Sequence, residues 1–214
     1  MEKIDVFNHI LPKIFFDKMM EVAGNFKDMG KRVRNIPVLI DLDERFRVID
    51  EFGEYRQILS IPNPPLEVLA GPDVSPTLAR LANDGMAELV TKHPNRFAGF
   101  TASLPMNNPD AAVTEMERAV KELGANGVQI FTNVAGKPLD LPEFLPLFEG
   151  MAGHDLPIWL HPARAANHPD YLSEDKSLLE IWWTFGWPYE TSVAMARIVF
   201  AGLFDKFPNL KIIT

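Results

Sequence analysis

The sequence contains no cysteine. Disulfide bonds, thiolate metal ligands and cysteine nucleophiles are therefore excluded together. The chain also lacks an excess of positive charge, because its formal net charge is -8 at pH 7. A surface that binds nucleic acid needs a basic patch, so we expect no nucleic-acid partner.

Long apolar runs are missing as well. No stretch of the chain reaches the roughly 18 apolar residues that a membrane-spanning helix requires. The N-terminal residues lead straight into a predicted strand and lack the apolar region and cleavage site of a signal peptide. We therefore expect a cytoplasmic protein without a membrane partner, whose metal ligands would be oxygen and nitrogen atoms.

What the chain does contain is a regular alternation of apolar strands and amphipathic helices. Short apolar runs predict strands at residues 3–7, 56–61, 97–103, 127–132, 157–161 and 210–214. Apolar positions that recur near a period of 3.6 predict helices at residues 43–52, 75–93, 109–124, 141–153, 177–185 and 190–207. Ser75 is predicted to cap the second of these helices, with Pro76 as its first residue. This alternation is typical of βαβ units around a parallel sheet.

The number of predicted strands bears on the fold and on the domain organisation. Six strands do not close an eight-stranded barrel, which takes roughly 250 residues. Because the last predicted strand leaves an open edge, we expect residues 1–214 to form a single (β/α) barrel domain that is incomplete at its C-terminus. Residues 13–40 have weak periodicity and are expected to be a partly helical insertion after the first strand. An open doubly wound sheet is the alternative, although no glycine-rich phosphate loop follows the first strand.

Two histidines stand at the C-terminal ends of predicted strands. His9 follows the first strand and His161 ends the fifth, and each is followed closely by proline. In a (β/α) barrel the C-terminal ends of the strands carry the catalytic and metal-binding side chains. Neutral imidazole is a common ligand for zinc and similar ions. We expect His9 and His161 to share one metal site, and capping of the sheet edge is the structural alternative for each.

Four further side chains are candidates for substrate binding. Arg164 and His168 lie in the loop just past the fifth strand, which faces the expected site. Arg45 and Arg47 lie two residues apart on the helix before the second strand, from which an arginine can hold a carboxylate in bidentate fashion. A solvated position on the helix surface is the alternative for both arginines. The aromatic cluster Trp182, Trp183, Phe185 and Trp187 is expected to belong to the core or to a subunit interface, with a substrate wall as the alternative.

Several segments resemble one known family in the same order along the chain. Residues 4–12 resemble its opening motif Ile-Asp-x-His-x-His-Ile-x-Pro, and residues 47–62 resemble its Arg-x-Met-Asp…Gly…Gln-x-Leu-Ser-x-x-Pro block. Residues 160–162, 188–191 and 202–211 resemble its later segments, the last of them in an ungapped run. The chain is thus similar to the amidohydrolase-related metal-dependent decarboxylases, the group that contains aminocarboxymuconate-semialdehyde decarboxylase and gamma-resorcylate decarboxylase.

The resemblance implies a fold, a cofactor and roles for individual residues. The implied fold is a (β/α)₈ TIM barrel of the metal-dependent hydrolase type, of which this chain supplies about six strands. A divalent metal, usually zinc or manganese, is implied at the strand ends, with His9 and His161 among its ligands. Arg47 matches the arginine that holds a substrate carboxylate. The family's catalytic histidine and its metal-binding aspartate correspond to positions after Thr214. Relatives of this kind are commonly homodimers, for which residues 190–207 offer an apolar face.

One position departs from the family pattern. The first histidine of the opening motif is Phe7 in this chain, and phenylalanine cannot ligate a metal. Three hypotheses therefore stay open. The first is a metal-dependent lyase that decarboxylates a small aromatic or muconate-like carboxylic acid, and the second is a metal-dependent hydrolase of a lactone or ester on the same scaffold. The third is a metal-free relative that binds a ligand without turnover.

Overall fold

A computed structural model describes residues 2–23 and 28–214 of the chain. Its main strands are parallel and lie in the orders β1-β2-β3 and β4-β5-β8-β9. Their bounds are β1 (Lys3–Asp5), β2 (Tyr55–Leu59), β3 (Phe97–Phe100), β4 (Ala102–Ser103), β5 (Val128–Phe131), β8 (Pro157–His161) and β9 (Lys211–Ile213). The six predicted strands are thereby confirmed. The strand predicted at 97–103 is divided at Thr101 into β3 and β4, so one segment joins the two sheets.

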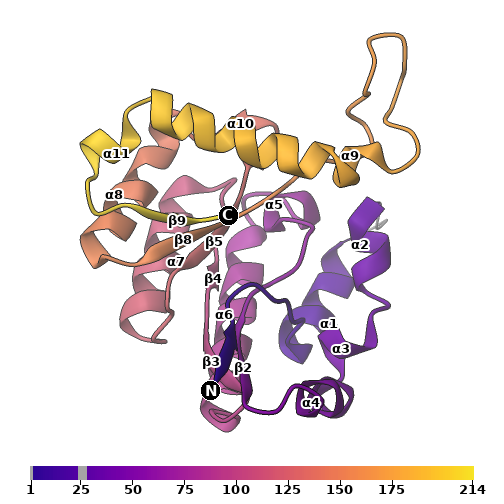
Figure 1. Cartoon of the computed structure of the whole chain (residues 1–214). Coiled ribbons are helices and arrows are strands. Elements are labelled where there is room, and N and C mark those ends of the chain that lie inside the picture. Colours follow the sequence, from indigo (N-terminus) through magenta and orange to yellow (C-terminus); the bar gives the residue numbers. More distant parts are fainter. Residues whose placement is uncertain (1, 24–27) are drawn as a thin grey trace.

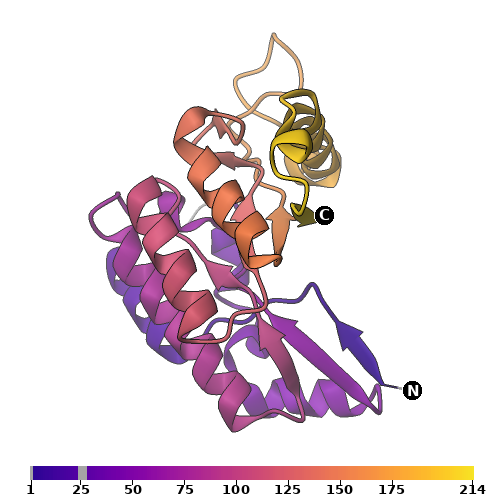
Figure 2. The same ribbon diagram turned by 90° about the vertical axis from the view of Figure 1, so that its left-hand side faces the viewer.

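Helices follow most of the strands and pack against them. Contacts join α6 to β3 and β4, α7 to β4, and α8 to β8. Figure 2 shows α6, α7 and α8 along one side of the strands, as in the outer layer of a barrel. The longer helices are α1 (Lys13–Val22), α4 (Leu42–Asp50), α6 (Ser75–Lys92), α7 (Pro109–Lys121), α8 (Leu145–His154) and α10 (Gly186–Phe200). The shorter elements are α2 (Asp28–Val33), α3 (Pro37–Ile40), α5 (Leu66–Leu69), η1 (Pro142–Phe144), α9 (Ile181–Thr184), α11 (Leu203–Lys206) and the hairpin of β6 (Asn133–Val134) with β7 (Lys137–Pro138).

The hydrophobic core lies between this helical layer and the strands. On α6 the fully buried residues Leu78, Ala82 and Met86 follow the helical period and face the strands. The side chains of Phe100 and Ile158 are buried on the strands themselves. Burial of this apolar surface is the main force that holds the helices to the sheet.

The segment 13–40, expected to be a partly helical insertion, forms α1, α2 and α3, with residues 24–27 outside the described part of the chain. Three other helical predictions need correction. Ser75 is not the N-cap of α6, because Val74 holds that position and the Ser75 hydroxyl bonds to Asn107 Oδ1 at 2.6 Å. The helix predicted at 177–185 is confined to α9, since Leu179 and Glu180 have positive φ angles of 55° and 63° that no α-helix accommodates.

The last predicted helix is divided into two. Gly202 has a φ angle of 72° and separates α10 from α11, whereas the sequence predicted one helix over 190–207. Glycine adopts this left-handed conformation without the steric cost that a Cβ brings, so it ends helices readily. The predicted apolar face of residues 190–207 is therefore carried mainly by α10.

The parallel arrangement brings the C-terminal ends of the strands to one edge, where the chain after β1 meets the end of β8. The indole Nε1 of Trp159 on β8 donates a hydrogen bond to the Val6 carbonyl at 2.7 Å. β1 begins the order β1-β2-β3 and β9 ends the order β4-β5-β8-β9. Figure 1 marks the N-terminus beside β2 and β3 and the C-terminus at β9. Among the described residues, no helix has the length and apolarity needed to cross a membrane.

Candidate functional site

His9 lies where the chain leaves β1 and crosses the end of β2. The backbone N–H of Ile10 donates to the Ser60 carbonyl at 2.8 Å, which holds this loop against the residue that follows β2. His9 Nδ1 lies 2.8 Å from Ser60 Oγ, and Ser60 Oγ lies 2.5 Å from the Asn8 carbonyl oxygen. Both contacts form because the parallel pairing of β1 with β2 brings the residues that follow the two strands side by side.

These two contacts determine the tautomer of His9. The Ser60 hydroxyl has one proton, which it donates to the Asn8 carbonyl because a carbonyl oxygen can only accept. The hydroxyl oxygen must then accept from His9 Nδ1–H. The lone pair of His9 therefore lies on Nε2, the nitrogen that a metal ion would use, and Ser60 is the partner that orients the ring.

His161 at the end of β8 has the same tautomer for a different reason. Its Nδ1 lies 2.7 Å from the carbonyl oxygen of Pro162, so Nδ1 carries the proton and Nε2 carries the lone pair. The ring is 4% exposed and packs against Phe131 and Trp187, with ring centroids 4.9 and 5.6 Å away. The site around His161 is thus shielded from water by aromatic rings.

The two histidines lie side by side, and Phe7 is their common neighbour. The His9 and His161 ring centroids are 5.1 Å apart. The Phe7 ring lies 6.1 Å from His9 and 5.9 Å from His161. Phe7 therefore occupies the position next to both imidazoles where the family pattern has a ligand.

Burial keeps both imidazoles neutral. It lowers the pKa of His9 to about 3, with further contributions from His161 and the Arg45 guanidinium. Burial also lowers the pKa of His161 to about 4, against a smaller opposing effect of the Pro162 carbonyl. Neutral imidazoles with a free Nε2 lone pair have the protonation state that metal ligands need.

The two residues fit a divalent metal as a pair of nitrogen ligands. The part of the chain that the structure describes contains no group of three or more histidine or carboxylate side chains that could hold a metal. A site built here from described residues consists of two histidines with Phe7 beside them. Open coordination positions are what a catalytic site keeps for water and substrate, whereas structural sites are closed.

The two arginines of α4 lie in different environments. Arg47 points to solvent, where its guanidinium pairs with Glu44 at 2.8 Å and with Glu51 at 3.2 Å. Arg45 is 5% exposed, donates to Gln57 Oε1 at 2.6 Å, and forms a very short contact with the His9 carbonyl oxygen. The structure therefore brings Arg45 to the histidine loop and leaves Arg47 on the outer face of α4.

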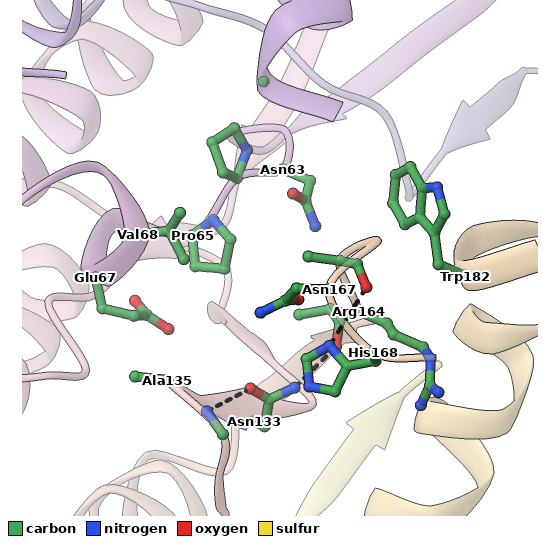
Figure 3. Close-up of a pocket in the computed structure, with 15 residues that line it drawn as sticks. Asn63, Pro65, Glu67, Val68, Asn133, Ala135, Arg164, Asn167, His168 and Trp182 are labelled. Carbon is green, nitrogen blue, oxygen red and sulfur yellow. Dashed lines mark hydrogen bonds between the residues drawn. The ribbon is translucent and has the colours of Figure 1, made fainter. Parts of the chain in front are cut away.

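Arg164 and His168 line a pocket beside the histidine pair. This pocket has a volume of about 480 Å³ and is formed by the loops after β2, β5 and β8 together with Gly30 and Trp182. Figure 3 shows the His168 ring between Asn167 and Asn133, and the Arg164 side chain running away from the pocket toward α10. The Arg164 guanidinium pairs there with Glu190 at 2.8 Å. Neither His9 nor His161 lines this pocket.

The aromatic cluster connects the pocket to the histidine pair. Trp187 contacts His161, and its ring centroid lies 6.2 Å from that of Trp182, which lines the pocket. Trp187 Nε1 also donates to the Arg164 carbonyl at 3.3 Å. Of the predicted cluster, Trp182 is buried whereas Phe185 is 72% exposed.

Two residues of this region were not singled out from the sequence. Ser60 carries a signal in the apolar alternation of the second strand, because a polar residue at a strand end tends to face the site. Glu67 carries no such signal, because its burial depends on segments that are distant in the sequence. Arg45 was a candidate together with Arg47, and its burial against the histidine loop likewise depends on distant segments.

Comparisons with known proteins agree with this architecture. The amidohydrolase family model matches residues 41–214. The gamma-resorcylate decarboxylase of Polaromonas sp. is 40% identical over 204 residues, which cover 92% of this chain and 62% of that protein. The 2-amino-3-carboxymuconate-6-semialdehyde decarboxylase of Dictyostelium discoideum is 31% identical over 227 residues, which cover 98% of this chain and 61% of that protein.

A solved structure extends the comparison to the fold. Dihydroxybenzoic acid decarboxylase from Polaromonas sp. JS666, with bound manganese and the inhibitor 2-nitroresorcinol, superposes with a TM-score of 0.76 at 33% identity. The alignment covers 99% of this chain and 64% of that one, so the chain spans somewhat less than two thirds of its relatives. The described strands correspond to part of a TIM barrel of this type. The chain belongs to the amidohydrolase family.

Proposed function

We propose that this chain is the metal-binding part of a decarboxylase that acts on a small aromatic carboxylic acid. The observation that carries the proposal is the His9–His161 pair, in which both rings are neutral and both Nε2 lone pairs are free. Family membership and the decarboxylase relatives at 40% and 31% identity support the reaction class.

The described residues have distinct tasks under this proposal. His9 and His161 would hold the metal, and Ser60 would keep the His9 ring in its binding orientation. A bound divalent metal supplies Lewis acidity toward the substrate's oxygen atoms. Phe131 and Trp187 would exclude water from His161.

Substrate contacts are a second part of the proposal. Arg164 and His168 stay candidates because both line the pocket next to the aromatic cluster. Arg47 stays a candidate from the family resemblance alone, and its ion pairs with Glu44 and Glu51 would have to open for it to bind a carboxylate. The histidine that the resemblance assigns to proton transfer corresponds to a position after Thr214.

The test is metal content per chain, followed by turnover. Purified protein is incubated with excess Mn²⁺ or Zn²⁺, desalted and measured by elemental analysis together with intact mass. We expect about one metal per chain for the unchanged protein and a clear loss for His161→Ala. His154→Ala is the matched control, because His154 on α8 pairs with Glu117 on α7 and lies outside the site. Release of CO₂ from gamma-resorcylate is then compared with hydrolysis of a lactone, which distinguishes the lyase from a hydrolase.

Phe7 favours a second candidate function, a metal-free relative that binds a ligand without turnover. The residue beside both imidazoles is apolar, and the described part of the chain offers no third ligand. A chain that takes up no metal at excess ion would contradict the decarboxylase proposal and support this alternative. Metal uptake with loss in His161→Ala would do the reverse.

We also propose a homodimer in the cytoplasm, with residues 1–214 belonging to one barrel domain. Large apolar side chains on and beside α10 support a subunit interface, since Phe185, Tyr189 and Phe200 are 72%, 60% and 88% exposed. Light scattering coupled to size-exclusion chromatography tests the dimer. The expected result is twice the chain mass, and a single chain mass at micromolar concentration would contradict it.

A further inference from the structure

The pocket next to the histidine pair contains a carboxylate whose capacity for hydrogen bonds the protein does not use. Glu67 lies on α5, directly after the loop that follows β2, and lines the pocket. Among the residues that the structure describes, none donates a hydrogen bond to Glu67 Oε1, although this atom is buried. Figure 3 shows the Glu67 carboxylate pointing into the space between α5 and the loop after β8.

An unpaired buried carboxylate is costly, so its persistence calls for a ligand. Burial raises the pKa of Glu67 to about 7, and the only opposing effect is a hydrogen bond from its own backbone. Among the described residues, no lysine or arginine forms an ion pair with Glu67, whereas Glu143 and Glu190 each pair with a basic side chain at 3.0 and 2.8 Å. A group with these surroundings gains most from a donor brought by a bound molecule.

Two asparagines of the pocket are already engaged. Asn133 donates to the Ala163 carbonyl at 2.8 Å and accepts from the Gly136 N–H at 2.9 Å. Asn63 donates to the Pro162 carbonyl at 3.4 Å. Among the described residues that line the pocket, two buried side-chain atoms have no hydrogen-bond partner, the donor Arg164 Nε and the acceptor Glu67 Oε1. Glu67 Oε1 is therefore the buried acceptor that a ligand's hydrogen-bond donor would meet.

The walls of the pocket limit the kind of molecule that fits. Pro65, Val68, Ala135 and the Trp182 side chain provide apolar surface around the polar anchor. A volume of about 480 Å³ lies within the range of small-molecule sites and accommodates a single aromatic ring. Apolar walls around a buried, unpaired acceptor suit a ring that bears a hydrogen-bond donor.

We propose that this pocket is a binding site for small aromatic molecules with a hydroxyl group, and that Glu67 accepts the hydrogen bond of that hydroxyl. A hydroxyl is favoured over an ammonium group because it can both donate and accept, so it pairs with the ionised and the protonated carboxyl alike. The site requires no metal. A phenolic reaction product would carry the same group, and this link alone rests on the proposed function.

The test uses phenol as the probe, with EDTA present so that binding at a metal cannot contribute. Anisole has the same ring and oxygen but no donor, and benzylamine carries a cation instead. We expect phenol to bind with a dissociation constant on the order of 1 mM and anisole about tenfold more weakly, the effect of one hydrogen bond. Glu67→Leu should weaken phenol about tenfold and leave anisole unchanged, whereas Glu67→Gln keeps an acceptor and should stay within about twofold.

The location of binding is checked by the indole N–H resonances in NMR spectra. The Trp182 resonance, assigned through Trp182→Phe, should shift on addition of phenol. The Trp159 resonance should not shift, because its N–H is bonded to the Val6 carbonyl outside the pocket. Glu143→Leu is the matched control, since Glu143 pairs with Lys137 on the surface.

Two outcomes would overturn the proposal. Equal losses of phenol and anisole in Glu67→Leu would mean that Glu67 does not accept from the hydroxyl. Tighter binding of benzylamine than of phenol, lost in Glu67→Leu, would make the pocket a site for cations. Because EDTA is present throughout, these outcomes are independent of metal uptake and of decarboxylation, so failure here and failure of the proposed function are distinguishable.

Discussion

Ser60 fixes the ring of His9, and its removal tests the metal proposal at the level of one atom. The Ser60 hydroxyl accepts from His9 Nδ1 at 2.8 Å and donates to the Asn8 carbonyl at 2.5 Å. Ser60→Ala leaves the imidazole free to rotate and to change tautomer. We expect metal affinity to fall by roughly 10–100-fold, the usual effect of losing such a partner.

Competition with a chelator of known affinity measures the change. Ser192→Ala is the control, because its hydroxyl donates to the Pro188 carbonyl within α10, away from the histidine pair. A metal affinity in Ser60→Ala within about twofold of the unchanged protein would argue against His9 as a ligand.

Phe7 gives the complementary prediction, a gain of affinity. Its ring is 6.1 Å from His9 and 5.9 Å from His161, so an imidazole at this position would point toward the same space. Phe7→His should raise metal affinity by about tenfold or more, because a direct ligand contributes at least as much as an outer-shell partner. Phe7→Leu removes the ring without adding a ligand, and equal affinities of these two variants in the same competition assay would contradict the prediction.

At the scale of elements, α4 presents two arginines whose roles differ by burial. Arg45 donates to Gln57, to the Val38 carbonyl and to the His9 carbonyl, so it joins α4 to β2 and to the histidine loop. Arg45→Met leaves those acceptors buried without a donor, and we expect unfolding free energy to fall by about 2–4 kcal/mol. Arg47→Met removes only exposed ion pairs and should change stability by less than about 0.5 kcal/mol.

Urea denaturation of both variants measures this contrast, and equal losses would show that Arg45 does not hold the loop. The Arg47→Met variant also tests the carboxylate role that the family resemblance assigns to Arg47. A large rise in KM with unchanged stability would support that role, and unchanged kinetics would remove Arg47 from the site.

The elements that the sequence predicted well are those whose signal is local. The strand at 157–161 was predicted with its observed bounds, because an apolar run between two prolines leaves little freedom. The division of 190–207 at Gly202 was missed, since apolar periodicity continues across the glycine and only its left-handed φ angle ends the helix. The N-cap at Ser75 was wrong because the hydroxyl found a partner in Asn107, on a distant segment.

At the scale of the whole molecule, the site depends on strand order, which local patterns do not encode. His9 and His161 were predicted as a pair because both follow strands, yet their separation and tautomers follow from Ser60 and the Pro162 carbonyl. Glu67 could not be singled out, because a glutamate on a short helix is ordinarily solvated. Its burial arises where the loops after β2, β5 and β8 converge.

Burial of these groups also makes the free energy of unfolding depend on pH. The two histidines and Glu67 contribute to that dependence with opposite signs. The pKa of His9 is lowered to about 3 and that of His161 to about 4, whereas both would titrate near 6.5 in the unfolded chain. Between these values the unfolded chain binds more protons, so the two histidines make unfolding free energy fall as the pH is lowered from about 6.5 to 4. The pKa of Glu67 is raised to about 7, so between about pH 4.5 and 7 the folded chain holds its extra proton and the effect has the opposite sign.

The unchanged chain and two variants, all without metal, should therefore differ in how steeply their unfolding free energy changes with pH. Each group contributes at most about 1.4 kcal/mol per pH unit, so the two histidines outweigh Glu67 in the unchanged chain. Glu67→Gln removes the opposing group and should lose stability more steeply on acidification. Replacing both histidines by asparagine should reverse the contribution of these groups, because only Glu67 remains.

Urea denaturation with EDTA between pH 5 and 6.5 measures the slopes. The difference between two chains removes the contribution of every titrating group that both chains contain. Parallel slopes for all three chains would mean that these side chains titrate alike in the folded and unfolded states, which is incompatible with the neutral buried pair on which the metal site depends.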